Sequence, residues 1–233
     1  MGDIIEDPLL RDRCDVFSDR HDAGEKLGRF LASLPAIRDP VTVLAIPAGG
    51  VPVGRMIAGA LGAPLSLAVV RKVRIPGTTE SGFGAVAWDG SVLLNERLRT
   101  ALGLSDREVG RAVAETQANV RERIALFLRG EQLPPLGGKT VVLTDDGLAS
   151  GFTMLAAARS ARKTDPARIV VAVPTASLSA AELVRREVDL VVCLNIRTGR
   201  TFAVADAYRE WHDLDDAEVL RELAGGPLTG RRA

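Results

Sequence analysis

The segment Val141–Thr153, with the sequence VVLTDDGLASGFT, constrains the fold of this chain more than any other. An apolar run stops at Asp145 and Asp146, and a loop of small and hydroxyl-bearing residues then leads into a helical pattern. This order predicts a buried strand, a polar strand end and a helix start. Backbone N–H groups at a helix start bind anions, whereas two adjacent carboxylates repel them. The segment therefore suits a ligand with two unlike parts, such as ribose 5-phosphate.

Each part of such a ligand has its own candidate residues. The carboxylates of Asp145 and Asp146 can take ribose hydroxyls, directly or through a divalent cation. The phosphate can lie over the loop and the first helical turn, where two side chains add hydroxyl groups. The predicted phosphate-binding residues are Ala149, Ser150, Gly151, Phe152 and Thr153.

Three other phosphate-site signatures fit this segment less well. A nucleotide triphosphatase loop needs Lys after its last glycine, and no Lys follows Gly151. A dinucleotide fingerprint needs Gly-x-Gly-x-x-Gly, but three residues separate Gly147 from Gly151. A haloacid-type phosphatase needs one residue between its two acids, whereas these acids are adjacent. A Rossmann-like enzyme of different chemistry stays a distant alternative.

Strand-like and helix-like segments alternate through most of the chain, which predicts an α/β fold with a parallel sheet covered on both faces. The predicted strands are Val41–Ile46, Leu65–Arg71, Thr140–Thr144, Ile169–Val173 and Leu190–Leu194. The predicted helices run from Ser18 or Asp19 to near Pro35, and over Val53–Leu61, Asp106–Leu128, Thr153–Arg162 and Ala180–Arg186, with capping boxes at Ser105/Glu108 and Ser179/Glu182.

Two further segments follow predicted strand ends, where ligands bind to such sheets. Pro47–Gly54 places two adjacent glycines before a helix, and glycines allow an anion to approach the backbone N–H groups closely. Arg71–Arg74 is a basic strand end. The following excursion, Gly82–Asn95, contains a hairpin signal at Asp89-Gly90.

The acid-pair segment resembles the signature of the type I phosphoribosyltransferases. With its Gly-Gly-Val-Pro loop and Asp-Asp-Gly-x-Ala sequence, the chain is most similar to a bacterial and archaeal group of unassigned acceptor. The resemblance implies a five-stranded parallel sheet flanked by helices, a hairpin loop that closes over the site, and a small hood. Residues 1–233 are then one domain, with a core of about 20–195 and a hood from the N-terminal segment and about 196–220.

The resemblance also implies the activity. Ribose 5-phosphate moves from phosphoribosyl pyrophosphate to a nitrogenous base, pyrophosphate is released, and Mg²⁺ is the cofactor. The implied catalytic residues are Asp145, Asp146 and Lys72, with the two acids holding the metal indirectly, together with substrate. The implied pyrophosphate-binding residues are Ala48, Gly49 and Gly50, in a loop with a non-proline cis peptide, and Lys72 with Arg71 or Arg74 in reserve. Phe202 is the candidate base-stacking residue.

Some positions depart from the family pattern. Ala48 stands where Arg is common in related sequences, so the positive charge for the diphosphate must come from elsewhere. Ser150 replaces a usual Thr but keeps the hydroxyl group, and Phe152 is bulkier than usual. A protein that senses phosphoribosyl pyrophosphate or a nucleotide without transfer is therefore the alternative function.

The composition limits the kinds of partner that we expect for this chain. Lysine plus arginine equals aspartate plus glutamate at 30 each, so no overall field favours nucleic acid or an anionic membrane. The N-terminus lacks a secretory signal pattern, which predicts a cytoplasmic protein. Cys193 lies in an apolar run and is expected to be a buried thiol. A homodimer is a family expectation.

Overall fold

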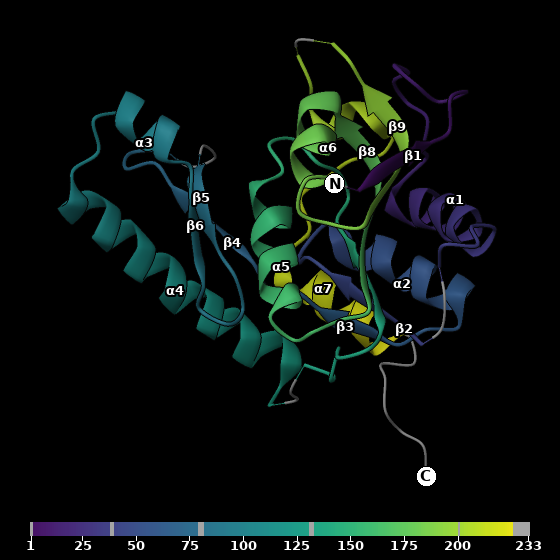
Figure 1. Cartoon of the computed structure of the whole chain (residues 1–233), viewed down its shortest axis with the longest axis horizontal. Coiled ribbons are helices and arrows are strands. Elements are labelled where there is room, and N and C mark those ends of the chain that lie inside the picture. Colours follow the sequence, from purple (N-terminus) through teal and green to yellow (C-terminus); the bar gives the residue numbers. More distant parts are fainter. Residues whose placement is uncertain (1, 38–39, 79–81, 131–132, 200, 226–233) are drawn as a thin grey trace.

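The main sheet contains six parallel strands in the order β1-β9-β8-β7-β2-β3 (Figure 1). The computed structural model describes residues 2–37, 40–78, 82–130, 133–199 and 201–225. The strands of this sheet are β1 (Asp3–Glu6), β2 (Val41–Ala45), β3 (Leu65–Leu67), β7 (Thr140–Thr144), β8 (Arg168–Ser177) and β9 (Leu190–Arg197). The predicted α/β class is confirmed, but the prediction of five strands is one short.

The strand that the sequence did not reveal is β1. Its four residues pair in parallel with β9, from Asp3 opposite Leu190 to Glu6 opposite Cys193. Because β1 lies at the edge of the sheet and is partly exposed, it has neither the length nor the continuous apolar character of the central strands. Part of the segment expected in the hood thus belongs to the main sheet.

Side-chain alternation along the strands divides the core between the two faces of the sheet. On β7, Val142 packs into the cluster that contains Leu27 of α1 and the apolar residues of α2 and α7. Its neighbours Val141 and Leu143 pack into the cluster that contains Met154 of α5 and the apolar residues of α6. Both faces are therefore buried. The helices that cover them are α1 (Arg20–Ala32), α2 (Gly50–Leu61) and α7 (Asp216–Ala224) on one face, and α5 (Phe152–Arg162) and α6 (Leu178–Val184) on the other.

Local capping signals fix several helix starts. The Asp19 carboxylate accepts a hydrogen bond from the Asp22 backbone N–H at 2.8 Å, which confirms one of the two caps predicted for α1. The capping box at Ser105 and Glu108 is confirmed. The box predicted at Ser179 is wrong: Ser177 caps α6, because its hydroxyl accepts from the Ala180 N–H at 3.1 Å.

The predicted strand Leu65–Arg71 is wrong, because this segment divides between two sheets. β3 ends at Leu67 in the main sheet, and the chain crosses to β4 (Arg71–Arg74), which pairs with β5 (Gly82–Val86) and β6 (Val92–Leu94). Residues 68–70 stay buried during the crossing, so the apolar run shows no break. This hairpin sheet packs between α4 and α5, beside α3, as an arm on the main body (Figure 1). The arm helices are α3 (Glu96–Ala101) and α4 (Asp106–Leu128).

The predicted hairpin turn at Asp89-Gly90 is present, and Gly90 has a φ of 81°. The Asp89 carboxylate contacts Nζ of Lys163, the C-cap residue of α5, at 2.8 Å. The turn is therefore attached to the C-terminal end of α5. Among the described helices, none is both long enough and apolar enough to cross a bilayer.

Candidate active site

The glycine loop and the acid pair lie side by side because β2 and β7 are neighbours in register, with Ala45 opposite Thr144. A Cβ atom on Gly49 would lie 1.8 Å from Asp146 Oδ2, and one on Gly50 would lie 2.8 Å from the Thr144 carbonyl oxygen. Only glycine fits at both positions. The peptide bond between Pro47 and Ala48, at the start of this loop, is cis. The structure therefore brings together two of the three predicted strand-end segments.

Arg20, the first residue of α1, contacts the acid pair at Asp146. Its Nε donates to Asp146 Oδ2 at 2.9 Å, and both side chains are largely buried. Its Nη1 donates to the His212 carbonyl oxygen at 2.9 Å. The guanidinium carbon lies 3.8 Å from the centre of the Trp211 ring, which is cation–π geometry.

Aromatic side chains of the 202–211 segment meet this cluster. Tyr208 donates its hydroxyl to the Asp146 backbone carbonyl oxygen at 2.6 Å. Its ring packs against Phe17 and Trp211, with centroids 5.6 Å and 5.1 Å away. Tyr208 and Trp211 therefore anchor this segment to the core. Phe202 is partly buried, and no aromatic pair in the described part of the chain includes it.

Burial dominates the electrostatics of the acid pair. It raises the pKa of Asp145 well above the usual value, and the adjacent Asp146 carboxylate raises this pKa further. Burial also raises the pKa of Asp146, although the Arg20 guanidinium opposes this shift. The pKa of Tyr208 is raised by burial and by the Asp146 charge. The pair thus holds negative charge that is poorly solvated and that a cation or ribose hydroxyls can stabilise.

The predicted phosphate loop connects the acids to α5 and is held by β8. Leu148 donates its N–H to the Thr175 carbonyl oxygen at 3.0 Å and accepts from the Ser177 N–H at the same distance. The Ser177 hydroxyl donates to the Ala149 carbonyl oxygen at 2.9 Å. Ala149 and Ser150 remain exposed.

The N-terminus of α5 has no side-chain cap. Gly151 occupies the cap position with a φ of 79°, a conformation that favours glycine. The first turn contains no acidic residue, and no side-chain hydrogen bond caps it. The backbone donors of this turn are therefore available to an anion.

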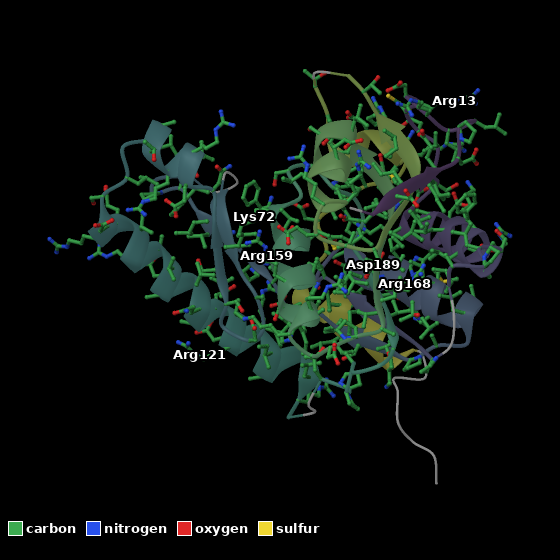
Figure 2. All side chains as sticks on the ribbon, in the orientation of Figure 1. Arg13, Lys72, Arg121, Arg159, Arg168 and Asp189 are labelled. Carbon is green, nitrogen blue, oxygen red and sulfur yellow. The ribbon has the colours of Figure 1, made fainter. Side chains whose placement is uncertain are left out.

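The predicted basic residues of β4 do not share one environment. Lys72 is exposed and lies between the hairpin sheet and the main body (Figure 2). Its charge lowers the pKa of Asp145, so it acts on the acid pair. Arg71 precedes Lys72 and has its side chain on the opposite face of the strand. Burial and the charges of Arg123 and Arg74 lower its pKa to about 10. Arg71 thus belongs with α4 rather than with the acids.

Two residues of this cluster were not predicted from the sequence. Arg20 lies three and seven residues before the buried Ala23 and Leu27, so it falls on the apolar stripe of α1. A charged residue on such a stripe is a signal that could have revealed it. Tyr208 gave no local signal beyond its aromatic character, because its partner Asp146 is remote in sequence.

The acid pair fits a divalent cation that is bound together with a substrate. The described residues include no cluster of three or more His, Cys, Asp or Glu side chains suited to a metal. Mg²⁺ is often bound by one or two carboxylates, with phosphate oxygens and waters as its other ligands. Asp145 and Asp146 carry carboxylate oxygens of the kind such an ion would need, and the poorly solvated charge of Asp145 is one that a cation would stabilise.

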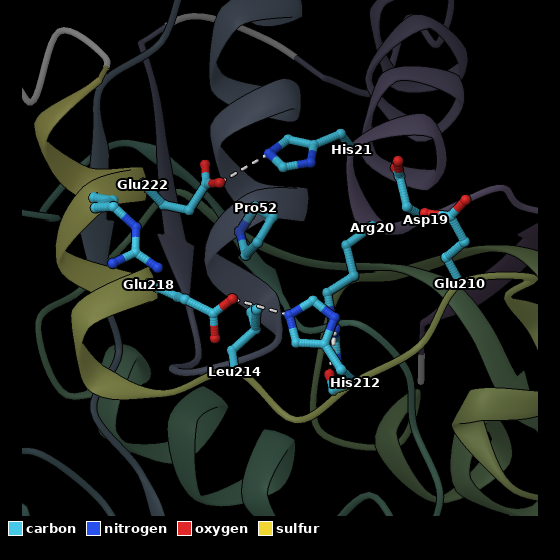
Figure 3. A pocket seen from close by; sticks show the side chains of 10 residues that line it. Asp19, Arg20, His21, Pro52, Glu210, His212, Leu214, Glu218 and Glu222 are labelled. Carbon is cyan, nitrogen blue, oxygen red and sulfur yellow. Dashed lines mark hydrogen bonds and ion pairs between the residues drawn. The ribbon is translucent and has the colours of Figure 1, made fainter.

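A pocket of about 260 Å³ lies behind Arg20, and no residue of the phosphate loop lines it. It contains two hydrogen-bonded pairs, His21 with Glu222 at 3.0 Å and His212 with Glu218 at 2.9 Å (Figure 3). α1, the first turn of α2, the 210–214 segment and α7 form its walls. Among the described residues that line it, none was predicted as a site residue.

Comparisons with known proteins agree with this geometry. Residues 21–207 match the phosphoribosyl transferase domain profile. Two Mycobacterium tuberculosis proteins, from strains CDC 1551 and H37Rv, are 36% identical over 208 residues, and their names give phosphoribosyl transferase as a provisional assignment. The match covers 89% of this chain but 46% of each relative, so the chain spans less than half their length. The crystal structure of TT1426 from Thermus thermophilus is similar at a TM-score of 0.72 and 34% identity, covering 90% of this chain and 98% of that one.

Proposed function

The chain belongs to the type I phosphoribosyltransferase family, and on this premise we propose that it transfers ribose 5-phosphate from phosphoribosyl pyrophosphate to a nitrogenous base. One observation carries the proposal: a partly buried acid pair lies one short loop away from a helix N-terminus that has no side-chain cap. The two features match the hydroxyls and the phosphate of a single sugar phosphate.

Different residues of the site bind different parts of the substrate. The amides from Ala149 to Thr153 bind the 5-phosphate, and the Ser150 and Thr153 hydroxyls add donors. Asp145 and Asp146 bind the ribose hydroxyls. Gly49 and Gly50 leave room for the pyrophosphate to approach the backbone. Lys72 supplies the positive charge that Ala48 lacks at this loop.

The reaction breaks the C1–O bond to pyrophosphate and forms a C1–N bond, while the acceptor nitrogen loses its proton. The sugar ring becomes positively charged in the transition state, and pyrophosphate gains negative charge. The acid pair stabilises the ring, and Lys72 stabilises the leaving group. Asp145 and Asp146 would hold Mg²⁺ together with the substrate, and the ion would supply further charge neutralisation.

Water must be kept from the cationic ring, because it would capture the sugar in place of the base. The segment around Val204 lies against Gly147, where a Cβ atom would come within 2.6 Å of a Val204 methyl group. This segment is one side of the cover, and the Gly82–Asn95 hairpin is the other. Phe202 is the base-stacking candidate.

Pyrophosphate release from phosphoribosyl pyrophosphate and Mg²⁺ tests the proposal, with common purine and pyrimidine bases supplied one at a time. We expect release that depends on both the metal and one class of base. Asp146→Asn should abolish the release. If no base supports release although phosphoribosyl pyrophosphate binds, the transfer activity is refuted.

Ala48 favours a second candidate function. Without a cationic side chain in the pyrophosphate loop, the site can bind a sugar phosphate or nucleotide with less stabilisation of a leaving group. A sensing protein needs only the binding. Binding of phosphoribosyl pyrophosphate without turnover, for any base, would select this alternative.

A further inference from the structure

Arg20 is a charged residue in a place where charge is unfavourable. It lies on the buried stripe of α1 with Ala23 and Leu27, and the whole residue is 7% exposed. A guanidinium loses its hydration there, so its contacts must compensate. Those contacts are the Asp146 carboxylate, the His212 carbonyl oxygen and the face of Trp211.

The three contacts fix the guanidinium in position and orientation. Nε and Nη1 donate in the plane of the group, each at 2.9 Å, while the Trp211 ring covers one face. A planar fork is suited to such a site, whereas an ammonium group is a single point charge. The Asp146 carboxylate is therefore held by a rigid partner on one side. On another side it is close to Gly49, whose missing side chain makes room for Oδ2.

The two acids are held in different ways. Asp145 accepts a hydrogen bond from the Asp146 backbone N–H at 2.9 Å, and the cation that acts on it is Lys72, which is exposed. Asp146 instead has a buried cation in direct contact. Its backbone is also fixed, because Tyr208 donates to its carbonyl oxygen. The structure thus immobilises one acid of the pair much more strongly than the other.

We propose that Arg20 is a positioning residue of the acid pair, which holds Asp146 in the one orientation that can bind a ribose hydroxyl. This inference rests on the proposed function of the site. It assigns Arg20 no contact with the substrate. It also links Trp211 and His212 to the acids, because these two residues fix the guanidinium that fixes Asp146.

The test compares the binding of ribose 5-phosphate with that of inorganic phosphate, in the presence of Mg²⁺, by calorimetry on the whole chain. Inorganic phosphate binds to the backbone amides at the start of α5 alone, whereas ribose 5-phosphate also binds to the carboxylates of Asp145 and Asp146 through its hydroxyls. The ratio of the two dissociation constants therefore reports on the acids and is insensitive to a general loss of binding. In the wild type we expect the sugar phosphate to bind at least about tenfold more tightly, the factor that one charge-assisted hydrogen bond contributes.

Arg20→Met should reduce this ratio to near one while leaving the phosphate affinity unchanged. Arg20→Lys keeps the charge and should restore part of the ratio, and it serves as the second variant should Arg20→Met fail to fold. Arg55→Met is the matched control, because Arg55 pairs with Glu222 on the far side of the pocket and touches neither acid. Its ratio should equal that of the wild type.

The outcomes separate the two ideas. A wild-type ratio above tenfold that Arg20→Met and Arg20→Lys both leave unchanged would overturn the role of Arg20 and keep the sugar phosphate site. A wild-type ratio near one would overturn the site itself, and the role of Arg20 with it.

Discussion

Gly49→Ala is the substitution whose effect follows most directly from the structure. Gly49 has φ −58° and ψ −33°, values that alanine adopts readily, so the backbone does not oppose the change. The new methyl group, however, would lie 1.8 Å from Asp146 Oδ2 and 2.4 Å from its Cγ. The carboxylate must retreat by roughly 1.6 Å to reach van der Waals contact, and Arg20 holds it at 2.9 Å.

We expect the displaced carboxylate to lose much of its ion pair with Arg20. Breaking a buried ion pair lowers the free energy of unfolding by about 3 to 5 kcal/mol, and relaxation of both side chains should limit this loss to about 2 to 3 kcal/mol. For a chain of this size this corresponds to a fall in melting temperature of roughly 4 to 12 °C. Ribose 5-phosphate should bind about tenfold more weakly or worse, because one hydroxyl contact is lost.

Thermal unfolding and calorimetric titration with ribose 5-phosphate measure the two effects. Gly59→Ala is the control, because a Cβ atom at Gly59, near the end of α2, meets nothing within 4 Å. It should raise stability by up to about 1 kcal/mol through helix propensity and leave binding unchanged. If Gly49→Ala unfolds at the same temperature as the wild type and binds ribose 5-phosphate equally well, the placement of the glycine loop against Asp146 is refuted.

Three further predictions follow from the charges of the site. The pKa of Asp145 is raised above 3.8, first by burial and then by Asp146, so the folded state binds its proton more tightly than the unfolded state does. Asp145→Asn should therefore raise the free energy of unfolding at pH 8, by a gain that shrinks as the pH falls toward 4, and it should abolish turnover. Denaturation midpoints of the variant that equal those of the wild type at both pH values would contradict this. Lys72→Met should weaken phosphoribosyl pyrophosphate binding about tenfold or more, whereas Arg71→Met should change it less than about twofold because Arg71 faces α4; titration calorimetry checks both, and the reverse order would reassign the basic residue. Asp146→Asn should lose far more turnover than Phe202→Ala, which should mainly raise the KM of the base; equal, mild effects in steady-state assays would count against both roles.

The sequence predicted those parts of the fold that local chemistry determines. The Asp19 cap, the Ser105 capping box and the Asp89-Gly90 hairpin turn each depend on residues within a few positions. The parallel sheet followed from the repeated alternation of apolar strands and helices. The split between β3 and β4 was missed because the crossing residues remain buried, and hydropathy does not distinguish one sheet from two.

The candidate site was predictable only in part, for a related reason. The residues that would meet the substrate directly lie in strand-end loops with recognisable sequences. The residues that hold Asp146 in place come from distant segments: Arg20 is 126 residues away and Tyr208 is 62 residues away. Their contacts depend on how α1 and the 202–211 segment pack over the sheet, which no short sequence pattern encodes.

A crystal structure with ribose 5-phosphate and Mg²⁺ tests the central claim most directly. We predict that the phosphate lies over the amides from Ala149 to Thr153 and that the ribose hydroxyls face Asp145 and Asp146, with the Arg20 contact retained. A phosphate bound elsewhere, for instance in the pocket behind Arg20, together with an empty loop at the start of α5, would contradict the account.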